Sequence, residues 1–142
     1  MPGCFLVVIV ETLDPQEALV GLTLEPFSVF RKGDRRFPTS NKNHDLHKVS
    51  GFKCDVASPS SNLRQEIAEA IQFLTAYEQD LRRLSSTLGV VSMNLDFGYD
   101  LRIDGERCFV QYDFLPPTLL KLCGSLSIGI ELSLFGPYGG PT

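Results

Sequence analysis

The side chains best suited to bind a small anion are concentrated in one basic segment, residues 31–36. This segment contains Arg31, Lys32, Gly33, Asp34, Arg35 and Arg36. Arginine forks bind phosphate or carboxylate groups through paired hydrogen bonds, and a turn glycine exposes backbone N–H groups to the same anion. The segment therefore predicts a ligand site for a phosphate or another small anion. The alternative is a solvated turn that balances charge in an acidic protein.

Two histidines follow this segment, in the order His44-Asp45-Leu46-His47. Imidazole and carboxylate groups are metal ligands, so His44 and His47 form a candidate metal site. Two ligands in a polar loop do not complete a coordination shell, and the alternative is a solvated loop. No cofactor is expected.

Carboxylates are the next candidates for chemistry, and they lie at Asp96, Asp100, Asp104 and Glu106. Asp96 and Asp100 share one side of an extended strand at a separation of about 13 Å, which is too far for a glycosidase pair. Asp104 precedes Gly105 in a pair of residues typical of a hairpin turn. Neither histidine is placed beside a serine or cysteine nucleophile. No catalytic residue is predicted, and these residues favour a non-catalytic protein over an enzyme without deciding between the two.

A recognition surface is the other interpretation of these residues. If one face of the sheet is open, Asp96, Tyr99, Asp100 and Tyr112, with Phe109 near them, predict a contact surface for a basic partner. The alternative is ordinary cross-strand packing of the aromatic side chains.

The apolar periodicity predicts the elements that position these residues. Strand patterns cover 4–10, 28–31, 48–58, 91–103, 108–114 and 126–134, and helical patterns cover 15–20, 63–88 and 117–123. The order is β-α-β-β-α-β-β-α-β. It predicts an α+β fold with a single mixed, mostly antiparallel sheet, one long amphipathic helix and two short helices. We expect one domain over residues 1–135 and a flexible tail over 136–142.

Several local features refine this expectation. Both faces of strand 4–10 are apolar, which predicts a central strand covered on both sides. In helix 63–88 the apolar residues form one stripe, and Glu66 and Asp80 are placed off it. Residues 35–47 are polar without periodicity and predict a long mobile loop.

Bulk composition narrows the class of protein. The 142 residues carry a formal net charge of −4, which argues against a general nucleic-acid binder. No apolar run reaches the length of a membrane span, so no membrane is expected. The four cysteines form no C-x-x-C pair, and we expect reduced thiols, mostly buried, in a cytoplasmic protein.

Short motifs resemble one known family. They are Asp14-Pro15, Gly21-Leu22-Thr23-Leu24-Glu25-Pro26, Phe30-Arg31-Lys32-Gly33-Asp34, and Leu119-Leu120-Lys121-Leu122 running into Ile128-Gly129-Ile130-Glu131-Leu132. Together they resemble the bacterial domain-of-unknown-function family 4279. The resemblance implies a small bacterial cytoplasmic protein and no known activity. That family typically has a tryptophan where this chain has Phe30 or Phe52, and this chain has none.

Three functions remain open from the sequence. The first is a non-catalytic protein-binding or accessory (immunity-like) module that recognises another protein or itself. The second is a protein or enzyme that binds a small anion through residues 31–36. The third is a nucleic-acid binder that uses the same segment.

Overall fold

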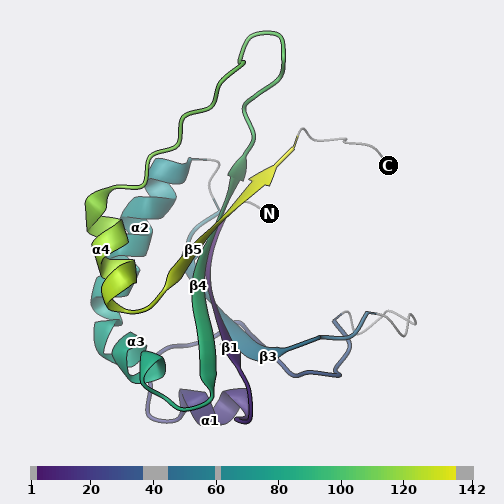
Figure 1. The fold of residues 1–142 in the computed structure, drawn as a ribbon, viewed down its shortest axis with the longest axis vertical. Helices are drawn as coiled ribbons and strands as arrows, with labels where there is room; N and C mark the ends of the chain where they lie inside the picture. The colour runs from purple at the N-terminus through teal and green to yellow at the C-terminus, as the bar shows by residue number, and fades with distance from the viewer. Residues whose placement is uncertain (1–2, 37–44, 60–61, 137–142) are drawn as a thin grey trace.

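The computed structural model describes residues 3–36, 45–59 and 62–136. Its elements are β1 (Gly3–Val10), α1 (Pro15–Leu19), β2 (Ser28–Phe30), β3 (Ser50–Ala57), α2 (Leu63–Ala76), α3 (Glu78–Ser85), β4 (Val90–Asp100), α4 (Pro117–Ser125) and β5 (Gly129–Phe135). Figure 1 shows one sheet with helices packed on one side and a long arm that projects beyond the sheet.

The five strands form one sheet in the order β2-β3-β1-β4-β5. The pairs β1–β3, β1–β4 and β2–β3 are antiparallel, whereas β4 and β5 are parallel. A parallel neighbour requires a crossover connection, and the arm together with α4 provides it. The predicted α+β fold with a mixed, mostly antiparallel sheet is confirmed.

Helices α2, α3 and α4 cover one face of the sheet (Figure 1). Alternate residues of β1 and β4 point toward them, and Leu6, Val8, Leu95 and Phe97 are fully buried there. No helix of the described chain lies on the opposite face, so Val7 and its neighbours two residues away are only half-buried. The first strand is central, as expected, but the expectation that it is covered on both sides was wrong, because no described helix packs on its second apolar face.

The long helix expected over residues 63–88 is divided at Tyr77 into α2 and α3. Tyr77 adopts φ −104° and ψ 20°, and its ring packs against Phe73 at 4.7 Å between centroids. Sheets twist, and a straight rod of that length loses contact with a twisted surface. The break lets Leu74 in α2 and both Leu81 and Leu84 in α3 remain fully buried.

Two acidic residues expected off the apolar stripe are buried instead. Glu66 in α2 is fully buried, and Asp80 in α3 is 9% exposed. One oxygen of Asp80 accepts hydrogen bonds from the backbone N–H of Thr23 at 2.7 Å, from its hydroxyl at 2.8 Å and from the N–H of Leu24 at 3.1 Å. Asp80 therefore fastens the segment after α1 to α3.

Residues 101–116 form the projecting arm, and the expected return strand over 108–114 is not present. The turn at its tip is confirmed, since the carboxylate of Asp104 accepts the N–H groups of Glu106, Arg107 and Cys108 at 2.8, 2.8 and 2.9 Å. Below the tip, the N–H of Arg102 donates to the side chain of Gln111 at 2.7 Å. Hydrogen bonds to side chains therefore replace the backbone hydrogen bonds that a pair of strands would form.

All four cysteines are free thiols, and Cys4, Cys54 and Cys123 are buried. Burial raises the pKa of Cys54 to about 12 and that of Cys123 to about 11, so both remain protonated near neutral pH. Among the described residues no helix has the length and apolar character to cross a bilayer. The predicted tail lies outside the described residues beyond Gly136.

Candidate functional site

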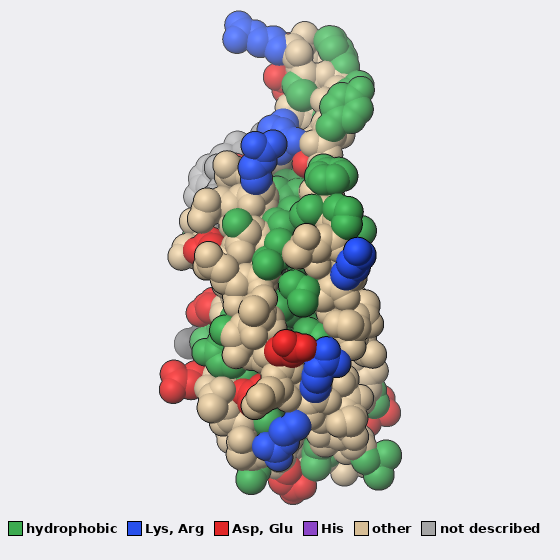
Figure 2. Space-filling model, turned by 90° about the vertical axis from the view of Figure 1, so that its left-hand side faces the viewer, with side chains coloured by type: hydrophobic (Ala, Val, Ile, Leu, Met, Phe, Trp, Pro, Cys, Tyr) green, Lys and Arg blue, Asp and Glu red, His purple; other side chains and the backbone are tan. Residues whose placement is uncertain are grey.

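The arm is the most exposed apolar feature of the described chain. Ile103, Phe109, Val110, Tyr112 and Phe114 are 41, 68, 55, 86 and 74% exposed. Figure 2 shows hydrophobic side chains gathered on the arm and continuing from its base down the helical face. Contiguous apolar surface of this kind is typical of a contact site for another macromolecule.

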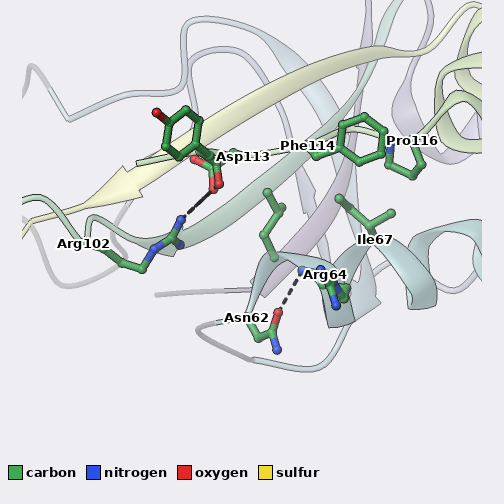
Figure 3. A pocket seen from close by; sticks show the side chains of 9 residues that line it. Asn62, Arg64, Ile67, Arg102, Asp113, Phe114 and Pro116 are labelled. Carbon is green, nitrogen blue, oxygen red and sulfur yellow. Dashed lines mark hydrogen bonds and ion pairs between the residues drawn. The ribbon is translucent and has the colours of Figure 1, made fainter. Parts of the chain in front are cut away.

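A groove of about 650 Å³ lies where the arm returns to the body. Its walls come from the first turns of α2 and from the arm, and its lining residues are Asn62, Leu63, Arg64, Ile67, Arg102, Tyr112, Asp113, Phe114 and Pro116. Figure 3 shows Ile67 facing Phe114 and Pro116 across the groove. The Arg102–Asp113 ion pair lies at another part of its wall. One part of the groove wall is therefore apolar, and another part is polar.

Asp113 holds the returning limb of the arm in place. Its carboxylate accepts hydrogen bonds from Tyr99 at 3.0 Å, from Arg102 at 3.0 Å and from the side chain of Gln111 at 2.9 Å. Burial favours the neutral carboxyl, but the bonds from Gln111, Arg102 and Tyr99 outweigh it and lower the pKa of Asp113. This carboxylate is therefore charged and fully engaged, which suits a structural role better than a reactive one.

Arg64 supplies the open positive charge of the groove. Its backbone N–H is held by the side chain of Asn62 at 3.0 Å, which caps α2. Its guanidinium forms no ion pair with any described residue, whereas Arg102 is paired with Asp113 at 3.0 Å. A partner with an acidic side chain beside an apolar one would match this part of the rim.

The four residues expected to share a partner surface are separated in the structure. Asp96 and Asp100 lie on the face of β4 that carries no helix, and Asp96 accepts a hydrogen bond from Ser133 at 2.6 Å. Tyr99 points to the opposite face and is fully buried, so it is not available to a partner. Tyr112 is exposed on the arm and lines the groove. Only Tyr112 belongs to the candidate contact surface.

The basic segment 31–36 forms a narrow ladder with residues 45–47. The N–H of Gly33 donates to His47 O at 2.9 Å, the N–H of His47 donates to Asp34 O at 2.8 Å, and Arg35 pairs with Leu46 in a β-bridge. The described parts of the expected mobile loop are therefore paired to one another. The backbone N–H groups of Gly33, Asp34 and Arg36 already donate to backbone carbonyls, so they are not available to bind an anion.

The side chain of Arg31 is also engaged. The guanidinium of Arg31 binds Asp14 through two bonds, of 2.7 and 3.1 Å, and lowers the pKa of that carboxyl. The N–H of Lys32 donates to the hydroxyl of Ser50 at 2.9 Å, and Lys32 lines a small hollow of about 260 Å³ that also contains Glu11. Arg31 is therefore bonded to Asp14, whereas Lys32 lines a separate hollow.

The candidate metal site is incomplete within the described residues. His47 stacks on Phe30 with 5.0 Å between ring centroids, and His44 lies outside the described residues. No group of three histidine, cysteine or carboxylate side chains that could hold a metal exists in the described part of the chain. His47 therefore acts as a packing residue for β2.

A buried carboxyl pair was not anticipated from the sequence. Both oxygens of Glu66 and one oxygen of Glu69 are buried, and none of the three has a hydrogen-bond partner among the described residues. Burial, followed by the neighbouring charges of Glu69 and Asp96, raises the pKa of Glu66 to about 7. Glu66 lies three residues after Leu63 and four before Ala70, and this spacing does indicate a position beside the apolar stripe.

Other residues of the arm and of the groove carried weaker signals. Phe109 and Val110 are adjacent apolar residues, and such a pair cannot both face a core from one strand. This break in alternation is the signal that the return limb exposes apolar side chains. Arg64 and Asp113 carry no such signal, because their roles depend on how the arm folds back onto α2.

Comparison with known proteins adds no further assignment: no family model, no curated protein and no solved structure matches this chain. The resemblance to the bacterial domain-of-unknown-function family 4279 therefore stays a prediction from short motifs.

Proposed function

We propose that this chain is a non-catalytic protein-binding module, and that the arm with the groove at its base is its contact surface. One observation carries the proposal: five large apolar side chains are exposed on a single projecting segment. Exposure of this much contiguous apolar surface opposes stability in water, and a partner that covers it removes the cost.

The groove defines the chemistry of the partner. Leu63 and Ile67 form an apolar floor that is almost fully buried, and Phe114 extends this surface into solvent. The exposed guanidinium of Arg64 stands at the rim. A segment that inserts an apolar side chain and places a carboxylate near Arg64 fits this arrangement, because central apolar anchors with polar rims are typical of protein interfaces.

A non-catalytic role is supported by the electrostatics of the site. Asp113 and Arg102 satisfy one another, and Tyr99 is buried behind them. Burial and the bond to Asp113 raise the pKa of Tyr99 to about 12, so its phenol does not serve as a base near neutral pH. An accessory or immunity-like role in a bacterial cytoplasm belongs to the same proposal, and the four free thiols are compatible with a reducing compartment.

The proposal is tested by capture with matched variants. Tagged wild-type protein is compared with Tyr112→Ser/Phe114→Ser and with Val20→Ser/Val91→Ser, which removes two exposed apolar side chains from the other end of the molecule. We expect one set of proteins bound by the wild type and the control and lost by the arm variant, followed by direct binding of the purified partner. Equal capture by all three proteins, or no capture by any, would contradict the proposal.

The alternative is a small-anion site at residues 31–36, and it has less support. The side chain of Arg31 is already bonded to Asp14, and the backbone of Gly33 is paired with His47. Thermal shift with inorganic phosphate distinguishes the two functions, since a bound ligand raises the melting temperature. Heparin retention that falls steeply with salt would instead indicate nucleic-acid binding through the same segment.

A further inference from the structure

The two edges of the sheet differ in how they are protected. Edge strands present unpaired N–H and C=O groups, and proteins protect them by making the strand short or by adding charges, proline or bulges. At one edge, β2 contains only three residues, Ser28–Phe30. At the other edge, β5 contains seven residues, Gly129–Phe135. The β2 edge is therefore protected by its length, and the β5 edge is not.

The sequence of β5, Gly-Ile-Glu-Leu-Ser-Leu-Phe, contains neither lysine nor proline. Its pairing with β4 runs in continuous register from Asn94–Gly129 to Asp100–Phe135, without a bulge. No described residue pairs with its outer edge, because β5 is the last strand in the order. A regular seven-residue edge of this kind is able to accept another strand.

The apolar layer under the helices also extends to β5, where part of it is exposed to solvent. Ile130, Leu132 and Leu134 stand opposite Leu95, Phe97 and Tyr99 of β4 and therefore share their face. The three β4 side chains are fully buried, whereas Leu132 and Leu134 are 40 and 44% exposed. The core thus continues to the last strand, and two leucines there lack cover on their outer side.

We propose that a second copy of this chain occupies the β5 edge, with the two β5 strands antiparallel about a two-fold axis at Leu132. In this register Leu132 faces the same residue of the other copy, and Ile130 faces Leu134. The two apolar stripes then join into one, and the two sheets become continuous. A two-fold interface requires a self-complementary surface, and this strand has one.

The same register also keeps the negative charges on the other face of the strand from standing directly opposite one another. Glu131 stands opposite Ser133 of the second copy, so the two glutamates are not directly opposed, and like charges directly opposite are destabilising. Gly129 stands opposite Phe135, which gives the aromatic ring space. Antiparallel ladders alternate bonded and non-bonded pairs, and a register centred on one residue satisfies either alternation. These matches favour a second copy over an unrelated peptide strand.

This interface lies on β5 and does not depend on what occupies the arm. Its first test is the mass in solution by size-exclusion chromatography with light scattering, at about 100 μM protein, a concentration at which micromolar dimers are populated. We expect twice the 15.7 kDa chain mass for the wild type. Leu132→Lys places two like charges at the axis, and we expect the dimer to weaken by tenfold or more. Val91→Lys is the control, because Val91 is an exposed strand residue outside the segment of β4 that pairs with β5.

The register is tested by cross-linking in a Cys108→Ser background, where the other three native thiols are buried. Leu132→Cys places two thiols together at the axis, and a diazene oxidant takes two electrons and two protons from them to form one S–S bond. Leu134→Cys is the matched variant, because the two introduced thiols would lie about four residues, or roughly 13 Å, apart along the strands. We expect rapid cross-linking of the first variant and slow cross-linking of the second.

The outcomes separate this proposal from its alternatives. A wild-type monomer, a dimer that Leu132→Lys leaves intact, or faster cross-linking through residue 134 would each overturn it. Leu132→Cys retains a small apolar side chain, so its result stands even if the lysine variant folds poorly. Loss of partner capture by the arm variant with an unchanged dimer would support both surfaces independently.

Discussion

The phenolic hydroxyl of Tyr99 donates a hydrogen bond to the carboxylate of Asp113 across 3.0 Å, and this bond joins the core to the arm. Tyr99 is fully buried under the helices, whereas Asp113 lies on the limb of the arm that returns to α4. The same carboxylate also accepts hydrogen bonds from Arg102 on the outgoing limb and from Gln111 on the returning limb. The arm is therefore anchored by one side-chain network at its base.

The first prediction concerns this anchor. Tyr99→Phe keeps the buried ring and removes the hydrogen bond, so the free energy of unfolding should fall by about 1–2 kcal/mol. Amide hydrogen exchange across residues 101–116 should accelerate more than exchange in β1. Tyr112→Phe is the control, because this exposed hydroxyl makes no hydrogen bond within the described structure. Unchanged exchange in the arm of Tyr99→Phe would show that the network does not hold it.

The second prediction concerns the pH dependence caused by Glu66. The folded protein raises the pKa of Glu66 from 4.5 to about 7, so between these values the folded state binds more protons than the unfolded state. Stability should therefore fall as the pH rises from about 4.5 to about 7, by at most about 3 kcal/mol, and level off above that range.

Glu66→Gln removes this ionisation. The variant should resemble the wild type near pH 4 and exceed its stability near pH 8, when both are measured by urea denaturation. Glu17→Gln changes an exposed helical glutamate and should keep the wild-type pH profile. A Glu66→Gln profile parallel to that of the wild type would assign the pH dependence to other groups.

The third prediction concerns Asp80. Asp80→Ala removes the acceptor for three hydrogen bonds from Thr23 and Leu24 and leaves backbone N–H groups without a partner. We expect a loss of about 2–4 kcal/mol in the free energy of unfolding. Asp80→Asn keeps one acceptor oxygen and should lose less. Equal losses for the two variants would show that charge, and not hydrogen bonding, fastens this segment.

The fourth prediction compares two glycines. A Cβ atom at Gly51 in β3 would overlap the carbonyl oxygen of Val8 in the adjacent strand, whereas one at Gly124 in α4 meets nothing. Gly51→Ala should therefore lower the melting temperature, because the backbone of the central sheet must shift. Gly124→Ala should stabilise by about 0.5–1 kcal/mol, because alanine is the better helix former. A neutral Gly51→Ala would contradict the close strand approach.

Much of the fold was predictable because it rests on local patterns. The alternation of β4 and the turn at Asp104 appear as predicted, since these depend on neighbouring residues only. Tyr99 was also predictable, because it shares the phase of Leu95 and Phe97 and must therefore face the core. Its assignment to a partner surface ignored that phase.

The rest depends on contacts between distant segments. The return strand was expected from the alternation of Val110 and Tyr112, but Gln111 bonds to the backbone of Arg102 and replaces the ladder. Whether Glu66 is buried depends on which residues pack against the side of α2. The apolar stripe in the sequence predicts only the centre of the buried face of the helix. The groove exists because the arm folds back beside Arg64, and no local pattern encodes that approach.

The central claim is that the arm is a protein contact surface, and site-specific photo-crosslinking in cells tests it most directly. A benzophenone side chain replaces Phe109 at the tip, and in a second protein it replaces Val91, which is 53% exposed at the far end of β4. We expect a discrete cross-linked species of higher mass from position 109 and none from position 91. Cross-linking that is absent at position 109, or equal at both positions, would contradict the account.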